Sequence, residues 1–105
     1  MLIELTEENY DSEVGRSDLP VIIDFYAIWC GPCKITKPIF NDLSIEYAGR
    51  VKFACLNIDQ NRNLAIKFGI SSIPTFTFIK NNQVLGKIIG GKSHDDLKDF
   101  IDSYL

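Results

Sequence analysis

Two cysteines separated by two residues are the part of this chain best suited to chemistry. Cys30, Gly31, Pro32 and Cys33 form a Cys-x-x-Cys motif, and a third cysteine, Cys55, stands apart from it. Such a pair is half of a metal site, a redox couple or a chance occurrence, and the rest of the chain has to decide among the three. Because three cysteines are few and odd in number, the disulfide framework of a small secreted protein is excluded.

The spacing of Cys30 and Cys33 suits a redox couple if a helix begins at Cys30. Residues three apart on a helix share a side and differ by about 4.5 Å along the axis, so the two sulfurs can bond with little backbone movement. Cys30 would face unsatisfied backbone N–H groups and the positive dipole end, which favour its thiolate. Cys33, one turn inside, should be less exposed and less acidic. We therefore predict that Cys30 attacks the disulfide of a partner and that Cys33 then attacks Cys30, releasing the reduced partner.

An acidic residue, Asp24, interrupts the apolar run from Val21 to Ala27 just before the cysteines. If the carboxyl group is buried, the cost of burying a charge should raise its pKa. Such an acid near the helix start could take the proton from Cys33 when this thiol has to become a nucleophile. The alternative is a strand with one face in water, from which Asp24 would point to solvent.

Strand and helix patterns alternate along the chain in the order βαβαβαββα. Strands are expected over residues 2–5, 21–27, 51–57, 75–79 and 84–89, and helices over residues 6–16, 32–49, 64–68 and 93–104. Strand–helix–strand units give parallel neighbours and a tight turn at Asn81 and Asn82 gives an antiparallel pair, which predicts an α/β fold with a mixed sheet and helices on both faces. The cysteine pair then lies at the carboxyl end of the central strand, where open α/β sheets bind their ligands.

The helix ends and faces are also expected from the pattern. Thr6 and Ser93 have the composition of N-caps for the first and last helices. Pro38 lies inside the long helix and should kink it. Steps of three and four residues place the apolar side chains of the long helix on one buried face, and these are Ile35, Ile39, Phe40, Leu43 and Tyr47.

The composition is that of a single globular domain over residues 1–105, with 46% hydrophobic and 24% charged residues. A sequence pI near 5.0 and a net charge of −3 argue against nucleic acid as a partner, because that binding needs clustered Lys and Arg. The longest apolar run, from Phe25 to Cys30, is far short of the roughly 20 residues that cross a bilayer, so no membrane segment is expected. Acidic residues dominate before Val21, opposite to a secretory signal, which predicts a cytoplasmic protein. A monomer is the default at this size.

These motifs together resemble those of the thioredoxin family. The resemblance rests on the run from Val21 to Lys34, which includes Trp29-Cys30-Gly31-Pro32-Cys33, and on Pro38, residues 56–59, Ile73-Pro74-Thr75 and Gly90. It covers essentially the whole chain, and Trp-Cys-Gly-Pro-Cys with an upstream Asp and a downstream Ile-Pro-Thr is highly specific. It implies the thioredoxin fold, a five-stranded mixed sheet flanked by four helices. It also implies the reduction of protein disulfides, with no cofactor beyond a redox-active disulfide between Cys30 and Cys33.

Position by position, the resemblance implies that Cys30 is the exposed nucleophile, Cys33 the resolving thiol and Asp24 the buried acid that handles its proton. Pro74 matches the cis-proline that lies opposite the disulfide. An extended substrate segment would pair with the backbone at Ile73 as an added strand. The surface around it is matched by Trp29, Gly31, Pro32, Ile73, Pro74, Ile89, Gly90 and Gly91. The implied partners are disulfide-containing proteins and a flavoprotein or ferredoxin-linked thioredoxin reductase.

The chain departs from the family at Cys55, where thioredoxins commonly have a lysine that pairs with the buried acid. An opposite charge lowers the pKa of an acid and a neutral thiol does not, so Asp24 should have a higher pKa here than in relatives that keep the lysine. Cys55 itself is expected to be a buried hydrophobic residue. Tyr26 and Ile28 stand where tryptophan and a charged residue are frequent, and we interpret both as tolerated changes of packing and surface.

Three other functions remain open on the residues alone. Cys30, Cys33, Cys55 and His94 have the number and kind of a Cys₃His zinc site, but a second closely spaced ligand pair is missing, and we predict no metal. His94 is instead expected to be exposed in the first turn of the last helix. A binding module would use the same groove without needing both cysteines. A disulfide oxidant or isomerase would use the same pair at a higher potential, although Gly-Pro between the cysteines resembles the reducing members.

Overall fold

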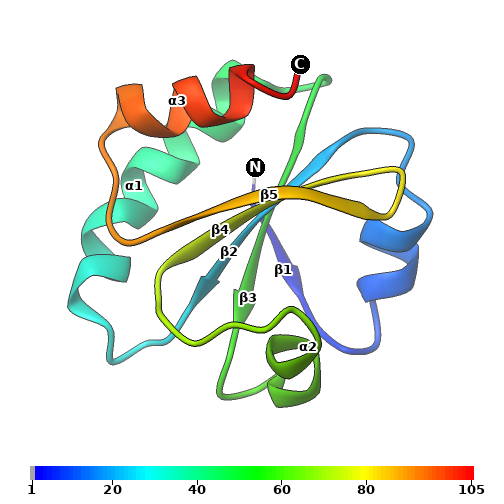
Figure 1. The fold of residues 1–105 in the computed structure, drawn as a ribbon, viewed down its shortest axis with the longest axis vertical. Coiled ribbons are helices and arrows are strands. Elements are labelled where there is room, and N and C mark those ends of the chain that lie inside the picture. Colours follow the sequence, from blue (N-terminus) through cyan, green and yellow to red (C-terminus); the bar gives the residue numbers. More distant parts are fainter. Residues whose placement is uncertain (1) are drawn as a thin grey trace.

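The structure, a computed structural model that describes residues 2–105, is a five-stranded sheet with helices on both faces (Figure 1). The strands are β1 (Leu2–Leu5), β2 (Val21–Tyr26), β3 (Lys52–Asn57), β4 (Thr75–Lys80) and β5 (Gln83–Ile89). The four helices of the described residues are a short π-type helix η1 (Asp11–Gly15), α1 (Gly31–Glu46), α2 (Arg62–Lys67) and α3 (His94–Asp102). The predicted fold class and element order are confirmed. None of these helices is long and apolar enough to cross a membrane.

The sheet has the strand order β1-β3-β2-β4-β5 and is mixed. β1, β3 and β2 are parallel, whereas β4 runs antiparallel to β2 and β5 antiparallel to β4. β2 is therefore the central strand, and the residues from Val21 to Phe25 are all buried. This is why that segment is β-branched and aromatic with little polar alternation. Its carboxyl end leads directly to the cysteine motif.

Alternate residues of the strands supply two hydrophobic cores on opposite faces of the sheet. The core under α1 and α3 includes Ile22, Phe40, Leu43, Phe53, Cys55, Phe76, Phe78, Leu97 and Ile101. The core under η1 and α2 includes Leu5, Val14, Val21, Ile23, Phe25, Ala54, Leu56 and Leu64. Because side chains alternate along a strand, Asp24 shares the face of Ile22 and points toward α1 and α3.

The long helix begins as predicted, and its predicted face is buried except at Ile35. The core contains Phe40, Leu43 and Tyr47, with Ile39 partly buried against it. Cys30 is its N-cap, and Pro32 lies in the first turn, where a missing N–H costs little. Pro38 lies inside the helix. The expected burial of Ile35 is wrong, because its side chain is 74% exposed. The buried stripe runs through Thr36, and one residue earlier on a helix is about 100° away around the axis.

The first helix is shorter than the predicted range of 6–16. Thr6 does accept a hydrogen bond from the backbone N–H of Asn9, at 3.2 Å, as a cap would. The Asn9 carboxamide oxygen accepts in turn from the Thr6 N–H, at 2.7 Å, and its NH₂ group donates to the Glu4 carbonyl, at 3.0 Å. These reciprocal bonds between Thr6 and Asn9 have the pattern of a capping box, and the Tyr10 N–H donates to the Thr6 carbonyl, at 3.1 Å, so the first helical bond forms at Thr6. Residues 7–9 nevertheless form a turn, and the regular element η1 begins only at Asp11.

The remaining turn and cap predictions are confirmed. Asn81 and Asn82 have φ values of 52° and 60°, the left-handed conformation that a two-residue turn between antiparallel strands needs. The Ser93 side chain caps α3 by accepting from the Asp96 N–H, at 3.1 Å. His94 lies in the first turn of α3 as predicted but is only partly exposed, because it pairs with Glu46 of α1. The hydrogen bond to Glu46 raises the pKa of His94.

Candidate active site

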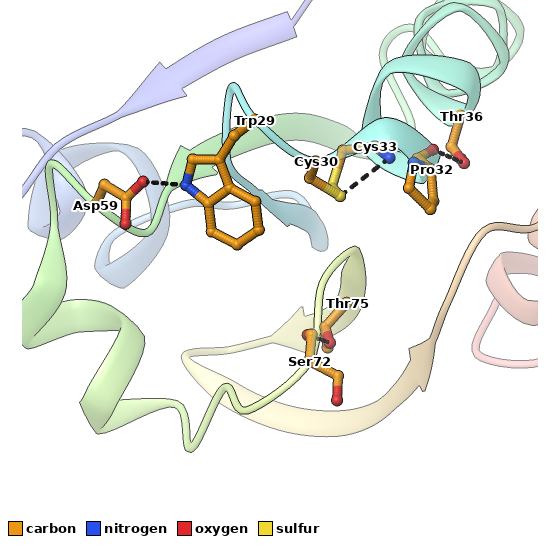
Figure 2. The surroundings of a disulfide bond; sticks show 8 residues. All are labelled: Trp29, Cys30, Pro32, Cys33, Thr36, Asp59, Ser72 and Thr75. Atoms are coloured by element: carbon orange, nitrogen blue, oxygen red, sulfur yellow. Dashed lines mark hydrogen bonds between the residues drawn. A yellow bond between two sulfur atoms is a disulfide. The ribbon is translucent and has the colours of Figure 1, made fainter.

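Cys30 and Cys33 form a disulfide between the end of β2 and the start of α1 (Figure 2). Their Cα atoms are 5.3 Å apart. The backbone N–H of Cys33 donates a hydrogen bond to Sγ of Cys30, at 3.2 Å. A helix N-terminus with an N–H aimed at the first sulfur is the arrangement that stabilises a thiolate. The predicted position of the pair is confirmed.

The predicted difference in exposure between the two cysteines is not observed. The side chain of Cys30 is 5% exposed and that of Cys33 is 4% exposed. The reason is the packing around the pair, where Ala27 is buried with them and Ile58 and Ile73 lie against the cluster. What distinguishes the two sulfurs is therefore the hydrogen bond to Cys30, since their solvent exposure is nearly equal.

The loop before β4 faces the disulfide from the other side of the site. The peptide bond between Ile73 and Pro74 is cis, as the family resemblance implies for Pro74. Figure 2 shows Ser72 of this loop and Thr75 at the start of β4 opposite the disulfide, and Ile73 packs against the cysteine cluster. This loop leads into β4, which is how residues some forty positions apart come to share one site.

Glycines after β5 close the third side of the site. The Gly90 N–H donates to the Pro74 carbonyl, at 2.8 Å, and Gly90 has a φ of +96°, which L side chains rarely adopt. Gly91 lies against the start of α1, since a Cβ there would be 3.4 Å from Oγ1 of Thr36 and 3.8 Å from Cβ of Pro32. The structure therefore brings together the three predicted segments around residues 29–33, 73–74 and 89–91.

The surface beside the disulfide exposes apolar side chains. Trp29 is 67% exposed, and Ile89 is about half exposed. The indole Nε1–H of Trp29 donates to a carboxylate oxygen of Asp59, at 2.8 Å (Figure 2). This contact holds the ring against the loop after β3. Asp59 was not assigned a role from the sequence, although it follows the strand next to the one that precedes Trp29.

Asp24 is buried, which decides between the two alternatives for this residue. Its side chain is 1% exposed, and Oδ1 has no hydrogen-bond partner within the described part of the chain. Burial raises the pKa of Asp24 to about 7; the positive charge of Lys37 lowers it and the negative charge of Glu4 raises it. A carboxyl group that titrates near neutral pH can take up and release a proton under ordinary conditions.

A small cavity of about 190 Å³ connects Asp24 with Cys33. Both residues line it, and α1 also contributes Lys34 and Lys37. Lys37 was missed in the sequence, yet its spacing could have indicated it. Residues four apart on a helix are neighbours, so Lys37 belongs on the same side of α1 as Cys33.

Cys55 is buried with the core, as expected for a hydrophobic residue. Burial, with the negative charge of Asp24, raises the pKa of the Cys55 thiol to about 12. His94 pairs with Glu46 instead of approaching the cysteines. Within residues 2–105, no three His, Cys, Asp or Glu side chains gather in a way that could hold a metal ion.

A sequence model of the thioredoxin family matches residues 1–103. The chain belongs to the thioredoxin family. It is 38% identical to a thioredoxin of Haemophilus influenzae, covering 99% of this chain and 97% of the relative, and 43% identical to one of Rickettsia felis, covering 96% of each. An M-type chloroplast thioredoxin of Pisum sativum is 40% identical over 96% of this chain and 59% of the relative. With its redox-active pair at Cys30 and Cys33, this member of the thioredoxin family is a thiol–disulfide oxidoreductase of the protein-disulfide reductase class.

Proposed function

We propose that this chain, acting as one thioredoxin domain over residues 1–105, is a general reductant of protein disulfides. Cys30 is the attacking thiol, Cys33 the resolving thiol and Asp24 the group that takes the proton of Cys33. The observation that carries the proposal is the Cys33 N–H directed at Cys30 Sγ, at 3.2 Å, at the first turn of α1. A backbone donor at a helix N-terminus stabilises negative charge on Cys30 and so favours it as the nucleophile.

The reaction takes two thiol–disulfide exchanges. The Cys30 thiolate attacks one sulfur of the target disulfide, forming a mixed disulfide and releasing the other target sulfur as a thiolate. Cys33 then loses its proton and attacks Sγ of Cys30, which breaks the mixed disulfide and releases the second target sulfur. Two electrons pass to the target, and the pair is left as the disulfide that the structure contains.

Asp24 suits the proton transfer of the second exchange. Cys33 is buried and has to become a thiolate without direct contact with bulk water. Asp24 lines the same cavity and has a pKa of about 7, so its carboxylate form is available at neutral pH to accept that proton. The cavity connects the two groups and is the natural route for the proton, directly or through a water molecule.

Target recognition is proposed to use the surface around the disulfide. Exposed Trp29 and Ile89 offer apolar contacts, and Gly31 leaves open space, since nothing lies within 4 Å of where its Cβ would be. An extended target segment would pair with the backbone at Ile73, beside Pro74. The full set proposed to contact targets is Trp29, Gly31, Pro32, Ile73, Pro74, Ile89, Gly90 and Gly91. Small residues and backbone contacts suit unrelated targets.

The catalytic cycle needs a partner that restores the dithiol. We propose a thioredoxin reductase, either a flavoprotein or a ferredoxin-linked enzyme, as the electron donor, and disulfide-containing proteins as the acceptors. The protein is proposed to act as a monomer in the cytoplasm, without a metal or another cofactor. Coupled assays with NADPH or with ferredoxin as the electron source would identify the donor.

Reduction of insulin in the presence of dithiothreitol tests the proposal. The wild-type chain is expected to accelerate insulin precipitation, and Cys30→Ser is expected to abolish the acceleration. If neither holds, the chain uses its groove only to bind partners. A measured reduction potential above about −200 mV would instead assign the pair to an oxidant or isomerase.

A further inference from the structure

A positively charged side chain, that of Lys37, lines the cavity between β2 and α1 together with Asp24 and Cys33. The lining of the cavity comes from β2, the loop that follows β2, and α1, and consists of Asp24, Tyr26, Ala27, Ile28, Cys33, Lys34 and Lys37. We propose that Lys37 is a positioning residue for the resolving exchange, its ammonium group keeping Asp24 in the charged form that accepts the proton of Cys33. This inference deepens the proposed function and rests on it.

The position of Lys37 on α1 and its contact with Tyr26 keep its ammonium group beside the cavity. It lies four residues after Cys33 on α1, so both side chains are on the same side of the helix. Its Nζ lies 4.6 Å from the centre of the Tyr26 ring, a cation–π contact. The Tyr26 hydroxyl donates to a carboxylate oxygen of Glu4, at 2.9 Å. The Tyr26 ring, anchored by this bond to β1, therefore gives the Lys37 ammonium a defined place at the cavity.

The strand residues that face Asp24 do not supply a positive charge. β1 contributes the Glu4 carboxylate, which has the same sign as Asp24 and raises its pKa. β3 contributes Cys55, whose pKa of about 12 keeps it a neutral thiol, and β4 contributes the apolar Phe76 opposite Asp24. From α1, Lys34 also lines the cavity, but the positive charge that lowers the pKa of Asp24 is that of Lys37.

The Lys37 charge increases the fraction of Asp24 carboxyl groups that are ionised and can therefore act as a base. Burial holds the pKa of Asp24 at about 7 even with Lys37 in place, so about half of the carboxyl groups are charged at neutral pH. Without the ammonium, the carboxyl group would hold its proton to higher pH. The resolving exchange would then slow at and below neutral pH and recover in alkali.

Three variants separate this charge effect from a structural one. Lys37→Gln removes the charge, Lys37→Arg keeps it, and Lys34→Gln removes a like charge from the wall of the same cavity. Two readouts are recorded against pH on the reduced, full-length proteins. The first is the carboxyl ¹³C chemical shift of Asp24. The second is the rate at which Cys33 releases thionitrobenzoate from the mixed disulfide that Ellman's reagent forms with Cys30.

We expect Lys37→Gln to move the midpoints of both profiles to higher pH by roughly 0.5 or more, about a threefold change in proton affinity, given the partial solvent screening of an exposed lysine. Lys37→Arg should keep the wild-type midpoints, and Lys34→Gln should leave them unchanged. The proposal is overturned if Lys37→Gln moves neither profile, if only the carboxyl titration moves, or if Lys34→Gln has an equal effect. Failure of the proposed function is distinguishable, because the wild type itself would then form no mixed disulfide at Cys30, whereas failure of this inference leaves the wild-type exchange intact and only the response to Lys37→Gln absent.

Discussion

Cys55 lies directly opposite Asp24 in the parallel register of β3 and β2. Both side chains are buried. Burial raises the pKa of Asp24 to about 7 and that of the Cys55 thiol to about 12, so the neighbouring thiol stays neutral and gives the carboxylate no opposite charge. The acidity of the carboxyl group proposed to serve catalysis is thus governed by burial, with Lys37 as a partial compensation.

Placing a cation at position 55 should make Asp24 more acidic. In Cys55→Lys, an ammonium group would replace the neutral thiol beside the carboxyl group, and an opposite charge favours the charged form of an acid. We expect the midpoint of the Asp24 titration, followed by NMR, to fall below that of the wild type. Cys55→Met is the matched neutral control and should keep a midpoint close to the wild-type value. An equal or higher midpoint in Cys55→Lys, in a variant with a native-like spectrum, would contradict the electrostatic argument.

Asp24→Asn should stabilise the protein in a pH-dependent way. The pKa of Asp24 is raised from 3.8 to about 7 on folding, so the folded state binds this proton more tightly than the unfolded state does. The resulting stability is fully present below about pH 4 and is lost as the pH rises through about 7, a difference of about 4 kcal/mol. Asn carries no charge to bury, so the variant should exceed the wild type by about 2–4 kcal/mol at pH 8 and by much less at pH 4.

Denaturant unfolding of the oxidised proteins between pH 4 and pH 8 measures this difference in the free energy of unfolding. Asp18→Asn is the control, because Asp18 is exposed and its removal should leave the pH dependence as in the wild type. An advantage of Asp24→Asn that is constant across this range would mean that the carboxyl group is not buried in its charged form.

The fold was largely predictable because its local signals agree with one another. The apolar run from Val21 to Phe25 can only be satisfied by burial on both faces, and this makes it the central strand. Ile35 is the exception on α1, since it was predicted to be buried and is exposed. Its spacing fits the apolar stripe of α1 approximately, but which face of a helix becomes buried depends on how the helix packs on the sheet. The first helix was predictable at its cap but not in its length. Thr6 caps the segment as predicted, yet residues 7–9 form a turn and the regular element is confined to η1.

The position of the cysteine pair in the candidate site was predictable, because the spacing of the motif determines where both cysteines lie on the helix. Cys30 and Cys33 lie at a helix start in any chain that places a buried strand before them and a helix after them. The burial of Asp24 was not predictable, because the face of a strand is buried or exposed to solvent according to the helices that cover it. Here these helices are α1 and α3. Lys37 and the contact between Trp29 and Asp59 depend on tertiary packing in the same way.

Ile89→Lys should weaken the reduction of protein disulfides selectively. Ile89 is 51% exposed at the edge of the surface proposed to contact targets, and a charge there removes apolar contact with a target segment. A loss of about 1 kcal/mol corresponds to about a fivefold fall in kcat/KM for insulin. Reduction of Ellman's reagent, which lacks a peptide segment, should change little. Ile45→Lys, at an exposed position near the far end of α1, is the control and should leave both rates unchanged; an equal effect there would contradict a specific surface at Ile89.

Trapping the mixed disulfide tests the unequal roles of the two cysteines most directly. The reduced Cys33→Ser and Cys30→Ser variants are mixed with insulin, and the adducts are located by mass spectrometry of their peptides. Because Cys33→Ser keeps the proposed attacking thiol and lacks the resolving one, it should accumulate insulin covalently bound to Cys30, while Cys30→Ser should form no adduct on the same timescale. An adduct at Cys33 in Cys30→Ser that forms as fast, or the absence of any adduct at Cys30 in Cys33→Ser, would contradict the proposed mechanism.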